Sequence, residues 1–168
     1  MLQKSYLPLI AIGILAIGLF LGADFALVLN LQPPLGNSSV NRTPSVNILL
    51  YEGEMADGRY GFGYAANNLT SPGPSLKFTT ADLINITVVN VGMKPHTFAI
   101  TTTPAEGATL LFNAAIGSIQ APLLPRTTGS IVFAPDNAGF SYWYISTVPG
   151  DAAAGMYGAV LISTISPS

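Results

Sequence analysis

Short apolar runs separated by glycine, proline and asparagine turns recur along most of the chain after residue 45. In the run 83–91, isoleucine or valine occupies every second position from 84 to 88, with Asn85 and Thr87 between them. This period of two is typical of a strand with one buried face. Such runs predict strands over Asn47–Tyr51, Leu76–Phe78, Leu83–Val91, Thr97–Thr102, Ser130–Phe133, Phe140–Val148 and Tyr157–Ile165. Strands spaced in this way indicate an all-β, two-sheet sandwich.

One stretch of the predicted domain shows no clear period. Residues 105–119 fit neither the strand nor the helix pattern, and we interpret them as a loop with a short turn.

The first thirty residues follow a different pattern. Residues 6–23 carry no charge, and the apolar run continues past Asp24 to Leu31. About 20 apolar residues cross a bilayer as a helix, so we predict that residues 1–31 form a short cytoplasmic stub and one transmembrane helix. Lys4, the only charge before the run, favours a cytoplasmic N-terminus in the cell membrane and an extracytoplasmic remainder. A cleaved signal peptide ending near Ala23 is the alternative.

Small residues on the predicted helix indicate a packing face. Gly18 and Gly22 lie four positions apart, which brings them to the same side of a helix and allows close helix–helix contact in lipid. Residues 32–45 are rich in proline, serine and asparagine and predict a stiff linker. Residues 46–168 then form the extracytoplasmic domain, which is large enough to fold without a disulfide or a metal.

Charged residues are scarce throughout the chain. Lys, Arg, Asp and Glu make up 8% of the residues, against about 25% in a typical soluble domain. No basic patch is present, which argues against nucleic-acid binding. The one cluster of charges predicts a solvated hairpin and consists of Glu52, Glu54, Asp57 and Arg59.

Four sequons of the Asn-x-Ser/Thr type are candidate glycan acceptors outside the cell. They lie at Asn37, Asn41, Asn68 and Asn85.

The segment 142–158 carries the most specific pattern in the chain. An aromatic run leads to a Pro149–Gly150 turn, and Met156 precedes the next predicted strand. His96, the only histidine, lies upstream in the sequence Lys-Pro-His-Thr-Phe. This arrangement resembles the copper-ligand loop of cupredoxins, in which one strand ends in a cysteine and the return strand follows a methionine. The resemblance implies a cupredoxin-like Greek-key β-sandwich after the transmembrane helix.

The chain contains no cysteine. A copper centre for electron transfer depends on a thiolate ligand, so we expect no metal and no catalytic residue in this chain. His96 and Met156 are interpreted as packing and hydrogen-bonding residues that close the loop. Together with Asp151 they would bind Cu(II) or Zn(II) only weakly.

Two alignments of the loop with cupredoxin families are open. Small blue-copper proteins of the sulfocyanin type have Cys-x-x-Pro-Gly-His-x-x-x-Gly-Met, which places Ser146 at the cysteine and Asp151 at the histidine. Subunit II of haem–copper oxidases has Cys-x-Glu-x-Cys-Gly-x-x-His-x-x-Met. Laid on the same Met156, this second pattern puts the cysteine, glutamate, cysteine and histidine positions at Ile145, Thr147, Pro149 and Ala153.

The order of anchor, linker and domain is similar to the short, single-helix subunit II of prokaryotic terminal oxidases. Members that oxidise quinol keep the domain and lose the copper, because quinol reduces the haems from within the membrane. The resemblance implies a copper-less, archaeal-like quinol oxidase subunit. Its partners would be a subunit I that carries haem and copper, other membrane subunits and lipid, with quinol contacted only indirectly.

The resemblance also implies that His96 and the loop Thr147–Met156 dock on the outer face of the haem subunit. The competing interpretation is a stand-alone, membrane-anchored, sulfocyanin-like domain with a binding or structural role.

Overall fold

The computed structural model describes residues 43–164 of the chain. The predicted transmembrane helix with Gly18 and Gly22, the linker up to residue 42, and the sequons at Asn37 and Asn41 lie outside the described residues. Within residues 43–164, no helix is long and apolar enough to cross a bilayer.

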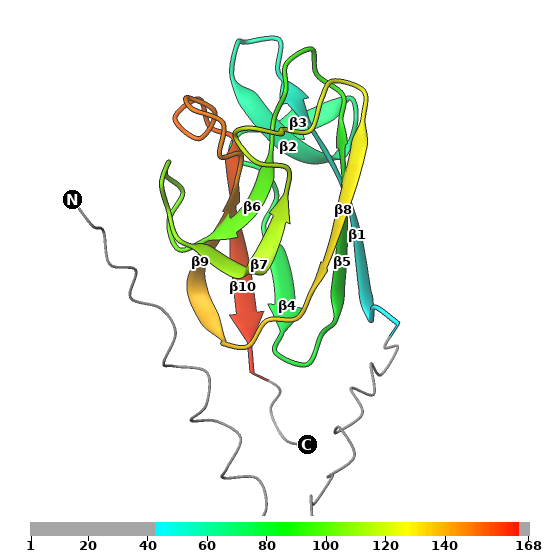
Figure 1. The fold of residues 1–168 in the computed structure, drawn as a ribbon, viewed down its shortest axis with the longest axis vertical. Helices are drawn as coiled ribbons and strands as arrows, with labels where there is room; N and C mark the ends of the chain where they lie inside the picture. The colour runs from blue at the N-terminus through cyan, green and yellow to red at the C-terminus, as the bar shows by residue number, and fades with distance from the viewer. Residues whose placement is uncertain (1–42, 165–168) are drawn as a thin grey trace, which may run out of the picture. The chain divides into compact units, whose positions relative to one another are not determined.

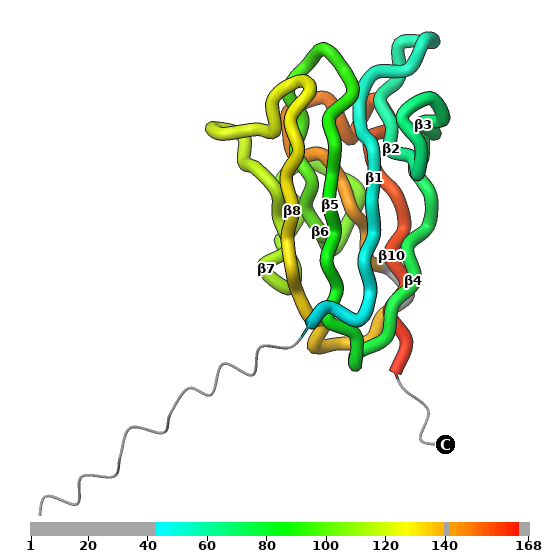
Figure 2. The backbone as a smooth tube through the Cα atoms, turned by 90° about the vertical axis from the view of Figure 1, so that its right-hand side faces the viewer, coloured from blue at the N-terminus to red at the C-terminus, as the bar shows by residue number. Residues whose placement is uncertain are grey.

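Two five-stranded sheets face each other in this part of the chain (Figures 1 and 2). The first sheet has the order β3-β2-β1-β5-β8, with β1 (Val46–Glu54), β2 (Tyr60–Ala65), β3 (Asn68–Thr70), β5 (Ile84–Asn90) and β8 (Thr128–Phe133). The second has the order β4-β10-β9-β6-β7, with β4 (Leu76–Thr79), β6 (Phe98–Thr101), β7 (Leu110–Ile116), β9 (Gly139–Ile145) and β10 (Tyr157–Ser163).

The pairing of strands makes both sheets mixed. β1 runs parallel to β5, and β4 runs parallel to β10, whereas the other pairs are antiparallel. The strand β4 belongs to the second sheet, whereas β3 before it and β5 after it belong to the first. The polypeptide therefore crosses between the sheets. The all-β sandwich expected from the sequence is therefore confirmed for the described residues.

Each of the seven predicted strands corresponds to a strand of the structure, with ends shifted by a few residues. β2 and β3 were missed because β2 contains Gly61 and Gly63, which obscure the alternation. A Cβ at either glycine would lie 2.3 or 2.2 Å from a backbone oxygen of the β3 side, at Thr70 or Asn68 respectively. The glycines thus allow the short strand β3 to approach.

The interpretation of residues 105–119 as a loop with a short turn is wrong, because β7 occupies much of this segment. Phe112 and Asn113 have φ angles of 55° and 51° within the strand. These left-handed residues interrupt the extended conformation, and the pairing of β7 with β6 shifts register there. The irregular strand therefore shows no period of two in its sequence.

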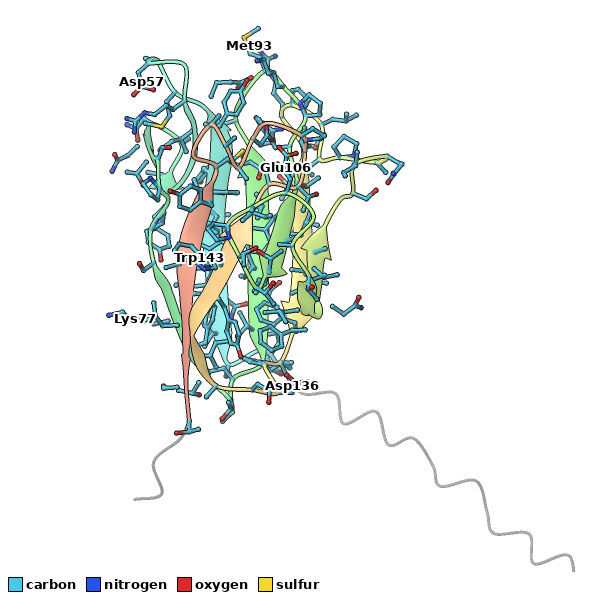
Figure 3. All side chains as sticks on the ribbon, turned by 90° about the vertical axis from the view of Figure 1, so that its left-hand side faces the viewer. Asp57, Lys77, Met93, Glu106, Asp136 and Trp143 are labelled. Atoms are coloured by element: carbon cyan, nitrogen blue, oxygen red, sulfur yellow. The ribbon has the colours of Figure 1, made fainter. Side chains whose placement is uncertain are left out.

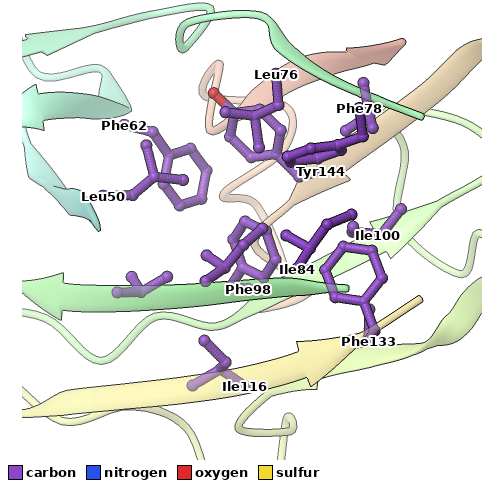
Figure 4. Close-up of a cluster of buried hydrophobic side chains, with 14 of the residues drawn as sticks. Leu50, Phe62, Leu76, Phe78, Ile84, Phe98, Ile100, Ile116, Phe133 and Tyr144 are labelled. Carbon is purple, nitrogen blue, oxygen red and sulfur yellow. The ribbon is translucent and has the colours of Figure 1, made fainter. Parts of the chain in front are cut away.

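The core lies between the two sheets (Figure 4). Ile84, Ile86 and Val88 are fully buried, as the alternation in β5 predicts. From the facing sheet, Tyr144 packs edge-on against Phe62, with ring centroids 5.0 Å apart. The Tyr144 hydroxyl donates to the carbonyl of Pro74 at 2.6 Å, so this large side chain is buried without an unpaired polar atom.

The strands β1 and β5 end at the same end of the sandwich (Figure 1). The loops gathered at this end are residues 55–59, 91–97, 117–127 and 146–156, and we call it the loop pole. Val46, where β1 begins, and Ser163, where β10 ends, lie at the opposite end (Figure 1). The loop pole is thus built only from internal connections between strands.

Candidate functional site

The loop between β9 and β10 is closed by its own backbone. The N–H of Ser146 donates to the carbonyl of Met156 at 3.1 Å, and the N–H of Met156 donates to the carbonyl of Asp151 at 2.9 Å. Gly155 has a φ of +95°, a conformation that favours glycine. A Cβ at this position would also lie 1.9 Å from Ser71 Oγ, whose hydroxyl donates to the Gly155 carbonyl. Glycine is therefore required where the loop turns into β10.

Three buried polar side chains meet inside the loop. Ser146 Oγ donates to Asp151 Oδ2 at 2.6 Å, and His96 Nδ1 contacts the same oxygen at 2.8 Å. A carboxylate only accepts hydrogen bonds, so the serine hydroxyl and the imidazole N–H both act as donors to one oxygen. Ser146 and His96 are fully buried and Asp151 is nearly so. We call this arrangement the Ser146–Asp151–His96 cluster.

Two threonines fasten the cluster to neighbouring backbone. The N–H of Thr97 donates to Ser146 Oγ at 3.1 Å, and the N–H of Thr147 donates to Thr97 Oγ1 at 2.6 Å. The hydrogen bonds therefore link the start of β6 with the end of β9, so the cluster is held in one geometry.

The positions named by the two loop alignments are arranged differently. The sulfocyanin-type alignment names Ser146 and Asp151, and Asp151 Oδ2 contacts both Ser146 Oγ and His96 Nδ1. The dinuclear alignment names residues that do not converge, because Pro149 and Ala153 are exposed and Ile145 is fully buried. Among the described residues, the two positions of the mononuclear alignment are therefore joined to His96 through the Asp151 carboxylate.

Met156 completes the set of positions named from the sequence. Its side chain is fully buried and belongs to the hydrophobic core between the sheets. Packing is thus a sufficient reason for a methionine at this position.

The residues present do not fit a copper centre for electron transfer. Ser146 offers a hydroxyl where a thiolate is required, and this hydroxyl is already a donor to Asp151. His96 Nδ1, the nitrogen that faces the cluster, is likewise engaged with Asp151. We therefore derive no chemical step through a metal in this domain.

A buried glutamate lies near the cluster, and sequence reasoning missed it. Glu52 was expected on a solvated hairpin, but its side chain is fully buried, so that prediction is wrong for this residue. The strand β1 alternates, and Leu50 and Glu52 both face the interior. The prediction holds for Asp57 and Arg59, which form an exposed ion pair at 2.7 Å. The alternation from Leu50 was the signal that could have placed Glu52 correctly.

The environment of Glu52 favours the neutral acid. Burial raises the pKa of Glu52 well above its ordinary value, and the nearby carboxylate of Asp151 raises this pKa further. Neither carboxyl oxygen of Glu52 has a hydrogen-bond partner, and neither does the Nε2 atom of His96. Buried polar atoms without a partner cost folding free energy. The interior near Glu52 and His96 therefore contains polar atoms whose hydrogen-bonding capacity is not satisfied.

An open pocket of about 410 Å³ lies over the cluster. Asp151 lines the pocket together with Tyr60, Lys94, Pro95 and Pro149. Lys94 Nζ donates to the Tyr60 hydroxyl at 2.5 Å and lies 5.0 Å from the centre of that ring. The hydrogen bond to the Tyr60 hydroxyl is the largest cause that raises the pKa of Lys94. The pocket thus combines one cation with one buried carboxylate.

The two described sequons differ in accessibility. Asn68 is exposed on β3, an edge strand of the first sheet. Asn85 is half-buried, and its side-chain amide donates to Asn47 Oδ1 at 3.1 Å. Asn68 is therefore the more accessible of the two candidate glycan acceptors.

Comparison with known proteins identifies the family to which this domain belongs. The loop with His96 and Met156 and the two facing sheets define a cupredoxin-like domain. Residues 57–166 match the family model described as multicopper oxidase. Because this match covers more than half of the sequence, the chain belongs to the multicopper oxidase family. No curated protein matches the chain.

Solved structures with the same fold include two multicopper oxidases and auracyanin B. A multi-copper oxidase from Pseudomonas thermotolerans is 17% identical with a TM-score of 0.54, over 75% of this chain and 31% of that one. A multicopper oxidase from Campylobacter jejuni is 19% identical with a TM-score of 0.54, over 72% of this chain and 26% of that one. Auracyanin B is 19% identical with a TM-score of 0.52, over 73% of this chain and 92% of that one.

These similarities establish a shared fold. The chain spans less than half of the length of the first multicopper oxidases that it matches, at 31%, 40% and 42%.

Proposed function

We propose that this chain is a non-catalytic subunit of a membrane-bound respiratory oxidoreductase, the copper-less subunit II of a terminal quinol oxidase. The observation that carries the proposal is the Ser146–Asp151–His96 cluster. It occupies the ligand positions of a cupredoxin loop with groups that hydrogen-bond to one another. A domain of this kind keeps the surface of a copper protein without the means to transfer an electron.

The hydrogen-bonded, closed form of the loop supports a role in assembly. Gly155 and the backbone hydrogen bonds of Met156 hold residues 146–156 in a fixed form. In the proposed complex, His96 and Thr147–Met156 dock on the outer face of a haem-bearing subunit. The loop shields that face from water and braces a nearby quinol or proton-exit region. The subunit itself holds no cofactor, and its predicted transmembrane helix packs on the partner through Gly18 and Gly22.

A second candidate function is a stand-alone, membrane-anchored domain with a binding or structural role. The specific observation in its favour is that Ser146 and His96 both contact Asp151, so the positions of the mononuclear alignment form one hydrogen-bonded group. The pocket over Asp151 supplies a surface on which such a domain could bind a partner.

The two functions are separated by what accompanies the chain. We would solubilise native membranes in mild detergent, purify a tagged chain, and record the reduced-minus-oxidised visible spectrum and quinol-driven oxygen uptake. The oxidase proposal expects haem bands and quinol oxidation to co-purify with the tag. Recovery of the chain from intact membranes without haem would reject that proposal and favour the stand-alone domain.

The substitution His96→Ala tests whether the role of His96 is structural. If the role is structural, His96→Ala lowers oxidase activity only in proportion to the loss of assembled complex. Intact assembly with abolished turnover would instead assign His96 to proton or quinol chemistry.

A further inference from the structure

Two loops of the loop pole expose a group of apolar side chains. Val91 and Met93 come from the β5–β6 loop, and Ile119 and Leu124 come from the β7–β8 loop. Met93 is the most exposed of them, at 87%. These four residues, which we call the apolar rim, make up half of the exposed large apolar side chains in the described part of the chain. Figure 3 shows Met93 at one end of the domain and Asp136 towards the other.

The apolar rim stands on a rigid frame. His96 and Leu123 exchange two backbone hydrogen bonds, at 3.1 and 2.8 Å, which join the two loops. Asn90 strengthens the junction, because its side-chain amide donates to the carbonyls of Lys94 at 2.8 Å and Leu123 at 3.0 Å. The rim is therefore presented as one surface, and little conformational entropy is lost when it binds.

The same loops carry positive charge. Lys94 and Arg126 are the only charged residues in segments 91–95 and 117–126, and both are exposed. Arg126 has a φ of 62°, an uncommon conformation for a residue other than glycine, and its N–H donates to the Asn90 carbonyl at 2.8 Å. Backbone strain of this kind is found preferentially at functional sites. Glu54, the acid that contacts the first loop, has its carboxylate bonded to the N–H of Met93.

We propose that the apolar rim inserts into the interfacial region of an anionic lipid bilayer, with Lys94 and Arg126 against the headgroup phosphates. Apolar side chains flanked by basic residues are the combination that binds such interfaces, because buried apolar area and attraction to anionic lipid add together. Each cation near the surface strengthens partition by about fivefold. The proposal does not rest on the oxidase role and applies equally to a stand-alone domain.

The length of the chain before the domain permits this orientation. Val46 lies at the end opposite the loop pole (Figure 1), where the N–H of Ser45 donates to the carbonyl of Leu83. Between the predicted anchor and this fixed point, residues 32–44 span at most about 43 Å, whereas the nine residues of β1 rise about 30 Å. The predicted anchor and the apolar rim can therefore reach the same bilayer.

The absence of cysteine makes the test direct. We would place a polarity-sensitive fluorophore on Met93→Cys in the full-length chain, reconstituted in phosphatidylcholine–phosphatidylglycerol vesicles. Val132→Cys is the matched control, because Val132 is also exposed, at 50%, but lies on the outer face of β8. The proposal expects a blue-shifted emission and quenching by spin-labelled lipid at position 93, with a water-like emission and no quenching at position 132.

Charge is tested in the same system. Replacing phosphatidylglycerol with phosphatidylcholine, or introducing Lys94→Gln with Arg126→Gln, should weaken the quenching at position 93 several-fold. A water-like emission at position 93 in anionic vesicles would overturn the proposal. So would shielding that appears only when other membrane proteins are present, since that outcome assigns the rim to a protein partner.

Discussion

Replacing Glu52 with glutamine should remove a penalty that the folded domain incurs as pH rises. Glu52 is fully buried and neither carboxyl oxygen is hydrogen-bonded, so ionisation would leave a charge in the interior. Glutamine has nearly the same volume and never ionises. The substitution therefore tests the charge with little change in packing.

The sign follows from the raised pKa of Glu52 in the folded state. Above the ordinary glutamate pKa of 4.5, the unfolded chain loses this proton while the folded chain keeps it. The free energy of unfolding of the wild type then falls by about 1.4 kcal/mol for each pH unit, until pH passes the folded pKa. The stability that the neutral Glu52 retains is fully present below pH 4.5. It is lost progressively as pH rises from there to the folded-state pKa of Glu52. Glu52→Gln should abolish that slope and be more stable than the wild type at neutral pH.

The assay is denaturant unfolding of the full chain in detergent from pH 4 to pH 8, followed by the fluorescence of Trp143. Trp143, labelled in Figure 3, is the single tryptophan and lies on β9. The centroid of its ring is 5.8 Å from that of Tyr157. Subtracting the curve of the variant from that of the wild type isolates Glu52 from other titrating groups. An infrared band of a protonated carboxyl, present in the wild type and absent in the variant, provides a second measurement.

Parallel curves for the two proteins from pH 4.5 upward would refute the reasoning. Asp151→Asn serves as a control, because burial is the larger cause of the raised pKa of Glu52 and the charge of Asp151 the smaller. Most of the pH slope should therefore persist in Asp151→Asn.

Four further variants test the loop. Ser146→Cys with Asp151→His restores the ligand types of a mononuclear copper site around His96, and added Cu(II) should then give an intense thiolate charge-transfer band that the wild type lacks; an uncoloured double variant would mean that the loop no longer supports the site. Asp151→Asn leaves two buried donors without their carboxylate and should cost about 1–3 kcal/mol of unfolding free energy, measured by denaturant titration; unchanged stability would contradict the importance of the cluster. Gly155→Ala, with its φ of +95° and its approach to Ser71, should lower unfolding free energy by at least about 1 kcal/mol, whereas Gly150→Ala, with nothing within 4 Å, should show only the backbone effect.

The sequence predicted those strands in which buried apolar residues alternate regularly with more exposed ones. β5 was recognisable because Ile84, Ile86 and Val88 obey a strict alternation. β2 was missed because its glycines, which allow β3 to approach, obscure the alternation. β7 was missed because two left-handed residues interrupt its extended backbone and shift its register with β6.

The candidate site shows the same division. Its loop length, the turn glycine and Met156 could be aligned with cupredoxins, and this led to His96, Ser146 and Asp151. The hydrogen bonds among them could not be predicted, because 55 positions in the sequence separate His96 from Asp151. Glu52 was misplaced because a charged residue beside Asp57 and Arg59 suggests solvent, whereas the inward face of β1 decides its position.

The Ser146–Asp151–His96 cluster also changes what the domain needs during biosynthesis. A metal-held loop is complete only after an ion has been delivered, so its maturation depends on supply and on the redox state of a thiol. Here the final contacts are made by a hydroxyl, a carboxylate and an imidazole, which are all side chains of the polypeptide itself. Closure of the loop by these side chains is therefore part of folding itself.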